Sequence, residues 1–266
     1  MSEERFSFKK PLIIEDMTVR EVREALKTVK TALLPIGCTE QHGYHLPIRT
    51  DSLVAESVSL EAAKQVPIIL LPVLKYSYSG GFLEGTVQIK PETVYSVVKD
   101  LLESLISQGF KGVVIESGHG GGEHMAAIRR AAKQITLSNP DCYISINGAY
   151  SETAREILKG LVGTTHATTV ETSLVKYLRS ELVRDDFMVW EDRPKMKEPL
   201  EGPDEFIVRK QLEAEKIFNE KVKIGVGADP SFATAETGKK IFEEKVNNLI
   251  RLIRRMNDLV GQHDNN

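Results

Sequence analysis

The sequence predicts an α/β protein in which a mostly parallel sheet is sandwiched between helices, folded as a single domain. Short apolar runs rich in β-branched residues alternate with longer segments of helical character along most of the chain. Gly and Pro stand at many of the joints between these segments. Repeated strand–helix order is typical of parallel strands that helices cover on both faces.

The first half of the chain shows this alternation clearly. The segment 18–27 is predicted to be a helix, because Thr18 and Glu21 form a capping box at its start. The apolar run 31–37 stops at glycine and is predicted to be a strand, and 51–65 has helical character. The same order then repeats, with apolar runs at 67–74 and 112–116 on either side of a helical segment, 91–110, that opens with Pro at its first position.

The second half adds three elements and one excursion. A glycine-rich loop leads into a predicted helix at 123–137, followed by a fourth strand at 142–148. Near the C-terminus, 238–260 carries its apolar residues on one helical face. The stretch 190–205 is rich in Pro and charge, so we expect an inserted loop within a single domain of residues 1–266.

The composition argues against several classes of protein. A formal net charge of −3 makes nucleic acid an unexpected main partner. The chain lacks a run of roughly 18 apolar residues, the minimum for a membrane span. Its N-terminus lacks the apolar core of a signal peptide, and two cysteines do not make a disulfide framework. We therefore expect a cytoplasmic protein with no membrane association.

Acids and histidines gather just after the first predicted strand, in the stretch GCTEQHGYHLPIRTD. Residues i and i+2 of an extended chain point to one side, so Glu40 and His42 are expected to face the crevice at the carboxyl end of the sheet. Asp51 begins the next helix, where a carboxylate can also serve only to favour the helix dipole. Both interpretations of Asp51 stay open at this point.

Two further segments carry the same residue types. ESGHGGGEH follows the third strand and places His119 among glycines on the same edge of the sheet, although an ordinary strand–helix loop would look similar. It lacks the Lys-Ser/Thr ending of a P-loop. In GTTHATTVETS, His166 and Glu171 lie on either side of a helix start. The alternative there is a threonine cap followed by a first-turn acid.

Together these side chains predict a metal centre. Four of the six histidines, His42, His45, His119 and His166, lie in the three segments beside carboxylates, and a fifth, His124, adjoins the glycine-rich loop. This combination suits zinc, manganese or iron. Glu40, His42, Asp51 and His119 exceed what one catalytic zinc ion usually takes from a protein, so two divalent ions are expected. Cys38 lies close by, and we interpret it as a small packed residue.

The motifs resemble those of the creatininase family of metal-dependent amidohydrolases. LPIGCTEQHGYHLPIRTD is similar to the family's signature, and SGHGGGEH and THATTVETS resemble two of its loops. LEGTVQI and GVGADPSFATAETGKKIF match two more family segments, and all five occur in the family's order. The resemblance implies a parallel α/β fold, usually assembled into homo-hexamers, that cleaves an amide C–N bond with metal-activated water.

The resemblance also implies a ligand set. One ion would be bound by Glu40, Asp51 and His119, and the other by His42 together with Asp51 as the bridge. Creatininase uses a further Glu at the position of Gly121. Glu171, or less favourably Glu123, is therefore expected to replace it, unless water fills this position.

The predicted function is hydrolysis of a small cyclic amide or a formamide. His166 and Glu171 are the predicted catalytic residues, with His166 as the proton shuttle to the leaving nitrogen. His45 is either a partner that orients a ligand or a packed residue. The missing Glu leaves open a catalytically silent relative that binds metal or a metabolite. Creatinine itself is not expected, because creatininase surrounds its substrate with tryptophans and this chain has only Trp190.

Overall fold

The computed structural model describes residues 11–148, 151–159, 166–191 and 222–263. At its centre is a five-stranded sheet in which all neighbouring strands are parallel, in the order β1-β3-β2-β4-β5. The predicted parallel sheet is therefore confirmed. The strands are β1 (Leu12–Ile13), β2 (Thr31–Ile36), β3 (Ile69–Leu70), β4 (Gly112–Ser117) and β5 (Tyr143–Asn147).

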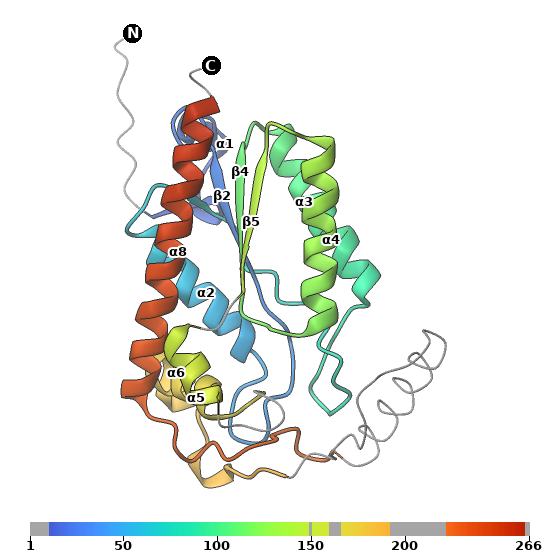
Figure 1. Ribbon diagram of the computed structural model, residues 1–266, viewed down its shortest axis with the longest axis vertical. Coiled ribbons are helices and arrows are strands. Elements are labelled where there is room, and N and C mark those ends of the chain that lie inside the picture. Colours follow the sequence, from blue (N-terminus) through green and yellow to red (C-terminus); the bar gives the residue numbers. More distant parts are fainter. Residues whose placement is uncertain (1–10, 149–150, 160–165, 192–221, 264–266) are drawn as a thin grey trace.

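Helices cover both faces of the sheet, as Figure 1 shows. The side that carries α3 and α4 also receives α1, and the opposite side is covered by α2, α5, α6 and the long α8. The helices are α1 (Val19–Ala25), α2 (Thr50–Ala63), α3 (Pro91–Ser107), α4 (Gly122–Ser138), α5 (Glu152–Leu158), α6 (Thr169–Arg179) and α8 (Ala235–His263). Short 3-10 turns lie at Ile14–Asp16, Ser180–Leu182 and Asp185–Phe187.

The core consists of two apolar layers, one on each face of the sheet. On β2, Leu33 packs into the layer shared with α2, α6 and α8, whereas Ala32 and Leu34 pack into the layer shared with α3 and α4. Successive side chains of a strand alternate between faces, so a strand buried on both sides must be apolar at nearly every position. This explains why the central strands appear in the sequence as unbroken apolar runs.

Some predicted boundaries differ from those observed. The run 67–74 contains only the two-residue strand β3, because Pro72 lacks the N–H that a continuing ladder requires. Pairing resumes where the Leu74 N–H donates to the carbonyl of Pro35. At the start of α1, the predicted capping box is present: the Glu21 N–H donates to Thr18 Oγ1, and the Thr18 N–H donates to Glu21 Oε2.

The sheet topology places the candidate site. β2 and β4 are neighbours, and their last residues, Ile36 and Ser117, are paired. Since parallel strands end at the same edge of a sheet, the loops that follow them begin side by side. These are the loops that carry the first two polar clusters of the sequence.

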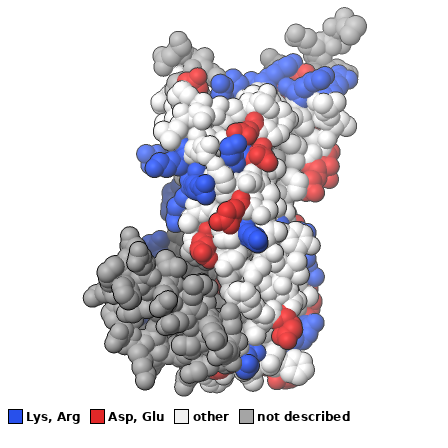
Figure 2. Space-filling model, turned by 90° about the vertical axis from the view of Figure 1, so that its right-hand side faces the viewer, with Lys and Arg blue, Asp and Glu red and all other residues white. Residues whose placement is uncertain are grey.

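On the face formed by α3 and α4, acidic and basic side chains lie interspersed among uncharged ones (Figure 2). Among the described residues, none of the helices combines the length and apolar character that crossing a membrane requires. The predicted insertion at 190–205 begins with two described residues, and its remainder lies outside the described part of the chain.

Candidate metal centre

The three polar segments of the sequence meet at the carboxyl edge of the sheet. The loop after β2 supplies two side chains, the first turn of α2 one, the loop after β4 one, and the entry to α6 two. Contacts between nitrogen and oxygen atoms of 3.0 to 3.8 Å connect the members of this group. They are Glu40, His42, Asp51, His119, His166 and Glu171, all six of the residues that the sequence predicted for the site.

Asp51 lies at the centre of the group. Its Oδ1 is 3.2 Å from Nε2 of His42, and its Oδ2 is 3.0 Å from Nδ1 of His119. The side chain is only 2% exposed although it stands in the first turn of a helix. The carboxylate therefore points inward to two histidines, and an interaction with the helix dipole alone does not account for its position.

Glycine at position 118 permits this arrangement. A Cβ atom on Gly118 would lie 2.1 Å from the main-chain oxygen of Asp51, far inside van der Waals contact. The loop after β4 can therefore approach the first turn of α2 closely enough to bring His119 to Asp51.

The candidate ligands form three overlapping groups; two of them share Asp51, and the third consists of Glu40, His42 and His166. Cys38, Glu40, Asp51 and His119 each offer one atom to a cluster whose atoms all lie within 4.8 Å of one another, and His42, Asp51 and Glu171 form a second such cluster. Within them, Glu40 Oε2 is 3.1 Å from Nδ1 of His119, and Glu171 Oε2 is 3.6 Å from Nε2 of His42. Asp51 is thus in the position of a bridging ligand.

Several buried oxygen and nitrogen atoms of this group are placed to bind cations. Glu40 Oε2, His42 Nε2 and Asp51 Oδ2 are buried and make no hydrogen bond. Nδ1 of His42 lies 3.0 Å from the carbonyl of Glu40 and donates to it, so Nε2 is the nitrogen that faces the acids and that becomes free to bind a cation once it loses its proton. Buried polar atoms without partners are costly, and divalent cations bound in the clusters that contain these atoms would satisfy them.

Charge in the group is balanced by protons when no cation is bound. Burial opposes protonation of His42, but Asp51 outweighs this effect and raises the pKa of His42 to about 10. The same balance raises the pKa of His119 to about 10. Burial acts in the opposite direction on Asp51, where the two histidines prevail and hold its pKa well below its ordinary value. Asp51 is therefore paired with two imidazolium groups at neutral pH, whereas burial raises the pKa of both Glu40 and Glu171.

The structure distinguishes Glu171 from Glu123 as a candidate to replace the Glu that creatininase has at the position of Gly121. Gly121 lies beside His119, and a Cβ atom there would be 2.4 Å from its Nε2, so this arrangement leaves no room for a side chain. Glu123 is exposed in the first turn of α4, outside the clusters formed by the described residues. Glu171 instead reaches His42 and accepts the main-chain N–H of Ala167 at 2.6 Å. Of the two, Glu171 is the one placed to act as a ligand.

His166 borders the group on its open side. Its Nε2 lies 2.7 Å from the carbonyl of Gln41 and donates to it, so Nδ1 carries the lone pair and faces Glu40 Oε1 at 3.8 Å. Burial, and then the neighbouring His42, lower the pKa of His166 to about 4. This imidazole is therefore neutral and able to accept a proton. The alternative considered for this segment is confirmed in part: Thr168 is the N-cap residue of α6 and Glu171 lies in its first turn, but Thr168 makes no side-chain capping bond.

His45 is packed and also connected to the site. It is fully buried, and its Nε2 lies 3.0 Å from Oγ1 of Thr172, the residue after Glu171. Burial, followed by the effect of His42, lowers its pKa to about 4, so the ring is uncharged. His45 thus holds the first turn of α6 in place and does not itself join either ligand cluster among the described residues.

A series of hydrogen bonds beside the site was not predicted from the sequence. Ser117 Oγ donates to the carbonyl of His119 at 2.7 Å, so it must accept from Nε2 of His124, which lies 2.9 Å away. Nδ1 of the neutral His124 then accepts from Ser77 Oγ. This chain fixes the main chain at His119. The sequence shows only that His124 adjoins the loop, because its partner Ser77 comes from a distant segment.

A comparison with known proteins finds a matching family model and several similar proteins. The family model described as creatininase, creatinine amidohydrolase, matches residues 15–253. A mycofactocin precursor peptide peptidase of Mycobacterium ulcerans is 28% identical over 239 residues, which are 86% of each chain. A 2-amino-5-formylamino-6-ribosylaminopyrimidin-4(3H)-one 5'-monophosphate deformylase of Methanococcus maripaludis is 26% identical over 230 residues, or 82% of this chain and 87% of the relative.

Solved structures agree with this fold. A crystal structure of creatininase matches with a TM-score of 0.75 at 20% identity, covering 92% of this chain and 98% of that one. A structure described as creatininase with Mn gives a TM-score of 0.73 at 22% identity and the same coverage. The similarity extends along nearly the whole length of both chains and includes the segments that carry the candidate ligands. The chain therefore belongs to the creatininase family.

Proposed function

We propose that the protein is a metal-dependent amidohydrolase that binds two divalent cations, zinc, manganese or iron, and hydrolyses a small cyclic amide or a formamide. One observation carries the proposal: Asp51 belongs to both ligand clusters, and each cluster contains buried acceptor atoms without a hydrogen bond. As a member of its family, the chain is a hydrolase that acts on carbon–nitrogen bonds, as the sequence predicted.

Each residue has a role in this proposal. Glu40, Asp51 and His119 would hold one ion, and His42, Asp51 and Glu171 the other. Divalent ions held there lower the pKa of a water molecule and polarise a carbonyl group. The buried carboxylates fix the positions of the ions, and the hydrogen bond from His42 Nδ1 to Glu40 fixes the orientation of one imidazole.

His166 is placed to move the proton that hydrolysis requires. Its Nδ1 lone pair faces the acids while Nε2–H is held by the carbonyl of Gln41. We propose that Nδ1 takes a proton from the attacking water and delivers it to the leaving nitrogen.

Replacing His166 by Ala should lower turnover by about 10²–10⁴-fold, the usual contribution of a general acid–base group. Metal content should stay as in the parent protein, because in this proposal His166 is not a ligand. Elemental analysis and single-substrate kinetics on the same preparation check both statements. Unchanged turnover would remove His166 from the mechanism, and loss of one ion per chain would make it a ligand instead.

Metal uptake should release protons at neutral pH. Because the pKa values of His42 and His119 are raised to about 10, both imidazoles are protonated at pH 7 and must lose those protons to bind metal. We expect the two imidazoles to release roughly two protons per chain, in addition to any proton that another ligand loses, and zinc affinity to increase with pH up to about 10. Calorimetry in two buffers of different ionisation enthalpy measures the number. Zinc binding without proton release would contradict the protonation state described here.

The raised pKa values of His42 and His119 also determine how the stability of the metal-free protein changes with pH. A histidine whose pKa is raised on folding stabilises the metal-free fold below its unfolded pKa, and this contribution is lost as pH rises through its folded value. The metal-free chain should therefore keep this contribution at neutral pH and lose it towards pH 10.

The substrate class can be tested directly. Metal-reconstituted protein should be screened against formamides, lactams and cyclic ureides, with the product amine detected by mass spectrometry. The likeness to a formylaminopyrimidine deformylase favours formamides. The likeness to a peptide peptidase favours a second candidate, cleavage of a short peptide, so the screen should include a peptide library. Hydrolysis of at least one class that stops on chelation would support the proposal.

The same screen tests the alternative of a silent relative. If the protein binds metal tightly and hydrolyses none of these classes, catalytic function is contradicted and metal or metabolite binding remains. A preparation that binds no divalent cation under any condition would contradict the metal centre itself.

Assembly into a homo-oligomer, a hexamer by family resemblance, stays a prediction.

A further inference from the structure

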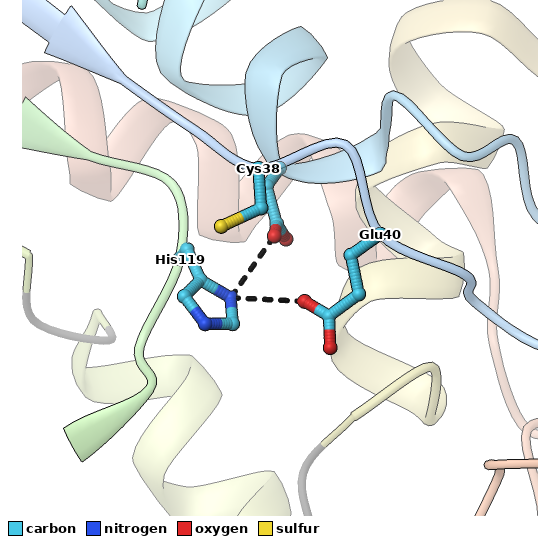
Figure 3. A group of neighbouring side chains, drawn as sticks. Cys38, Glu40 and His119 are labelled. Carbon is cyan, nitrogen blue, oxygen red and sulfur yellow. Dashed lines mark ion pairs between the residues drawn. The ribbon is translucent and has the colours of Figure 1, made fainter. Parts of the chain in front are cut away.

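The thiol of Cys38 lies against the candidate metal centre. Its Sγ belongs to the cluster in which Glu40, Asp51 and His119 each offer one atom and all these atoms lie within 4.8 Å of one another. The residue is 1% exposed. Figure 3 shows the sulfur of Cys38 and the carboxylate of Glu40 both directed towards the imidazole of His119 from the same stretch of main chain.

The main chain around Cys38 explains this direction. Thr39 pairs with Val87 in an isolated antiparallel bridge, and Thr39 Oγ1 donates to the carbonyl of Lys75 away from the site. In an extended segment the residues on either side of position 39 point to the opposite face, which is the face of the acids. Ser52 Oγ also donates to the carbonyl of Cys38 at 3.0 Å, which ties this residue to the helical turn that carries Asp51.

A second, independent observation indicates that the space beside the sulfur is made for a cation. Glu40 and Asp51 are 5% and 2% exposed, and an oxygen atom of each is buried without a hydrogen bond. The hydrogen bond of the thiol itself, to the carbonyl of Tyr78, is long at 3.8 Å. A packed residue, the interpretation favoured by the sequence alone, would not need a sulfur atom beside two buried carboxylates that share a single imidazole nitrogen, Nδ1 of His119.

We propose, on the basis of the metal centre described above, that Cys38 is a fourth protein ligand of the ion held by Glu40, Asp51 and His119. The Sγ–H proton passes to the buffer as the sulfur–metal bond forms. A thiolate is a soft ligand, so this position prefers zinc or iron to manganese or magnesium, which carboxylates alone would accommodate. In this proposal, Cys38 determines which metal ion the protein prefers.

Cobalt(II) reports thiolate ligation directly. The chain has only two cysteines, and Cys142 lies just before β5, so Cys142→Ala gives a background in which Cys38 is the only thiol. Titration of this variant with cobalt should produce a near-ultraviolet thiolate-to-metal charge-transfer band together with visible d–d bands. In the double variant Cys38→Ser/Cys142→Ala, the visible bands should persist and the near-ultraviolet band should be lost.

The outcomes separate this inference from the proposed function. Visible cobalt bands without a charge-transfer band in the Cys142→Ala variant would overturn thiolate ligation and leave the metal centre standing. No cobalt spectrum at all would overturn the metal centre and this inference with it. Thermal unfolding of both variants, with Cys38→Ala as a second replacement, shows whether the fold has been kept.

Metal competition gives a readout that a purely structural cysteine would not change. We expect Cys38→Ser to weaken zinc binding by about 10–100-fold, the range known for altered metal surroundings, and to leave manganese binding nearly unchanged. Equal losses for both ions would indicate a disturbed site and overturn the role of sulfur. Zinc affinity equal to that of the parent would overturn it as well.

Discussion

Asp51→Asn should remove both metal ions and almost all activity. The amide keeps the size of the side chain but loses the charge, and Asp51 is the member shared by the two ligand clusters. We expect well under one ion per chain by elemental analysis. Hydrolysis should fall by more than about 10³-fold, because loss of one hydrogen-bond donor at an oxyanion already costs about 10²–10³-fold and here every stabilising charge is lost.

Asp100→Asn is the matched control, since Asp100 is exposed on α3 and belongs to none of the candidate ligand groups of the described residues. It should keep both ions and full activity. Circular dichroism and thermal unfolding must show that the Asp51 variant is folded, so that missing metal reflects a missing ligand. Retention of two ions per chain in the Asp51 variant would contradict the bridge.

Lys245→Met should destabilise the fold by about 3–5 kcal/mol at pH 8, the usual result of breaking a buried ion pair on one side. Lys245 of α8 lies 3.2 Å from Glu116 Oε1 at the end of β4, and both side chains are buried. Asn147 donates to the other carboxylate oxygen at 2.6 Å. Without the ammonium group, Glu116 is left charged inside the protein with only this amide as its partner among the described contacts. Urea unfolding measures the loss.

The stability lost in Lys245→Met should increase with pH. Burial raises the pKa of Glu116 although Lys245 opposes this, so removing Lys245 raises the pKa further. A carboxyl group whose pKa is raised on folding destabilises the fold increasingly as pH rises through that range. The loss in Lys245→Met should therefore be larger at pH 8 than at pH 5.5.

Two further variants test the cause of this loss. Lys240→Met, an exposed position on the same helix, should change the unfolding free energy by less than about 1 kcal/mol. The double variant Glu116→Gln/Lys245→Met should recover much of the lost stability, because no buried charge remains. A deficit that is independent of pH and persists in the double variant would indicate lost packing instead.

Much of the fold follows from local pattern. The central strands β2 and β4 are long, apolar and bounded by loops, so the sequence predicts them well. The strand β1 has only two residues, which is too short for any periodicity, and the helix α5 lies in a segment that the prediction left unassigned. Pro72 shortens β3 through a missing hydrogen-bond donor that hydrophobicity does not register.

The site is predictable in part for a topological reason. Glu40 and His119 follow adjacent parallel strands, so their proximity is expected from strand order alone. Glu171 comes from α6, and no local rule states that this helix packs against the same edge; the resemblance to a family indicated it. The pair of Glu116 with Lys245 could not be anticipated, because two separate elements bring together residues that look ordinary in the sequence.

The pairing of acids with protonated imidazoles has a consequence for the order of assembly. In many small metalloproteins the ligands repel one another until the ion arrives, and the chain folds only then. Here two protons occupy the electrostatic role of the cations, so polypeptide folding need not wait for metal delivery. A chelator should leave a folded protein that is restored by adding the ion back, with no refolding step.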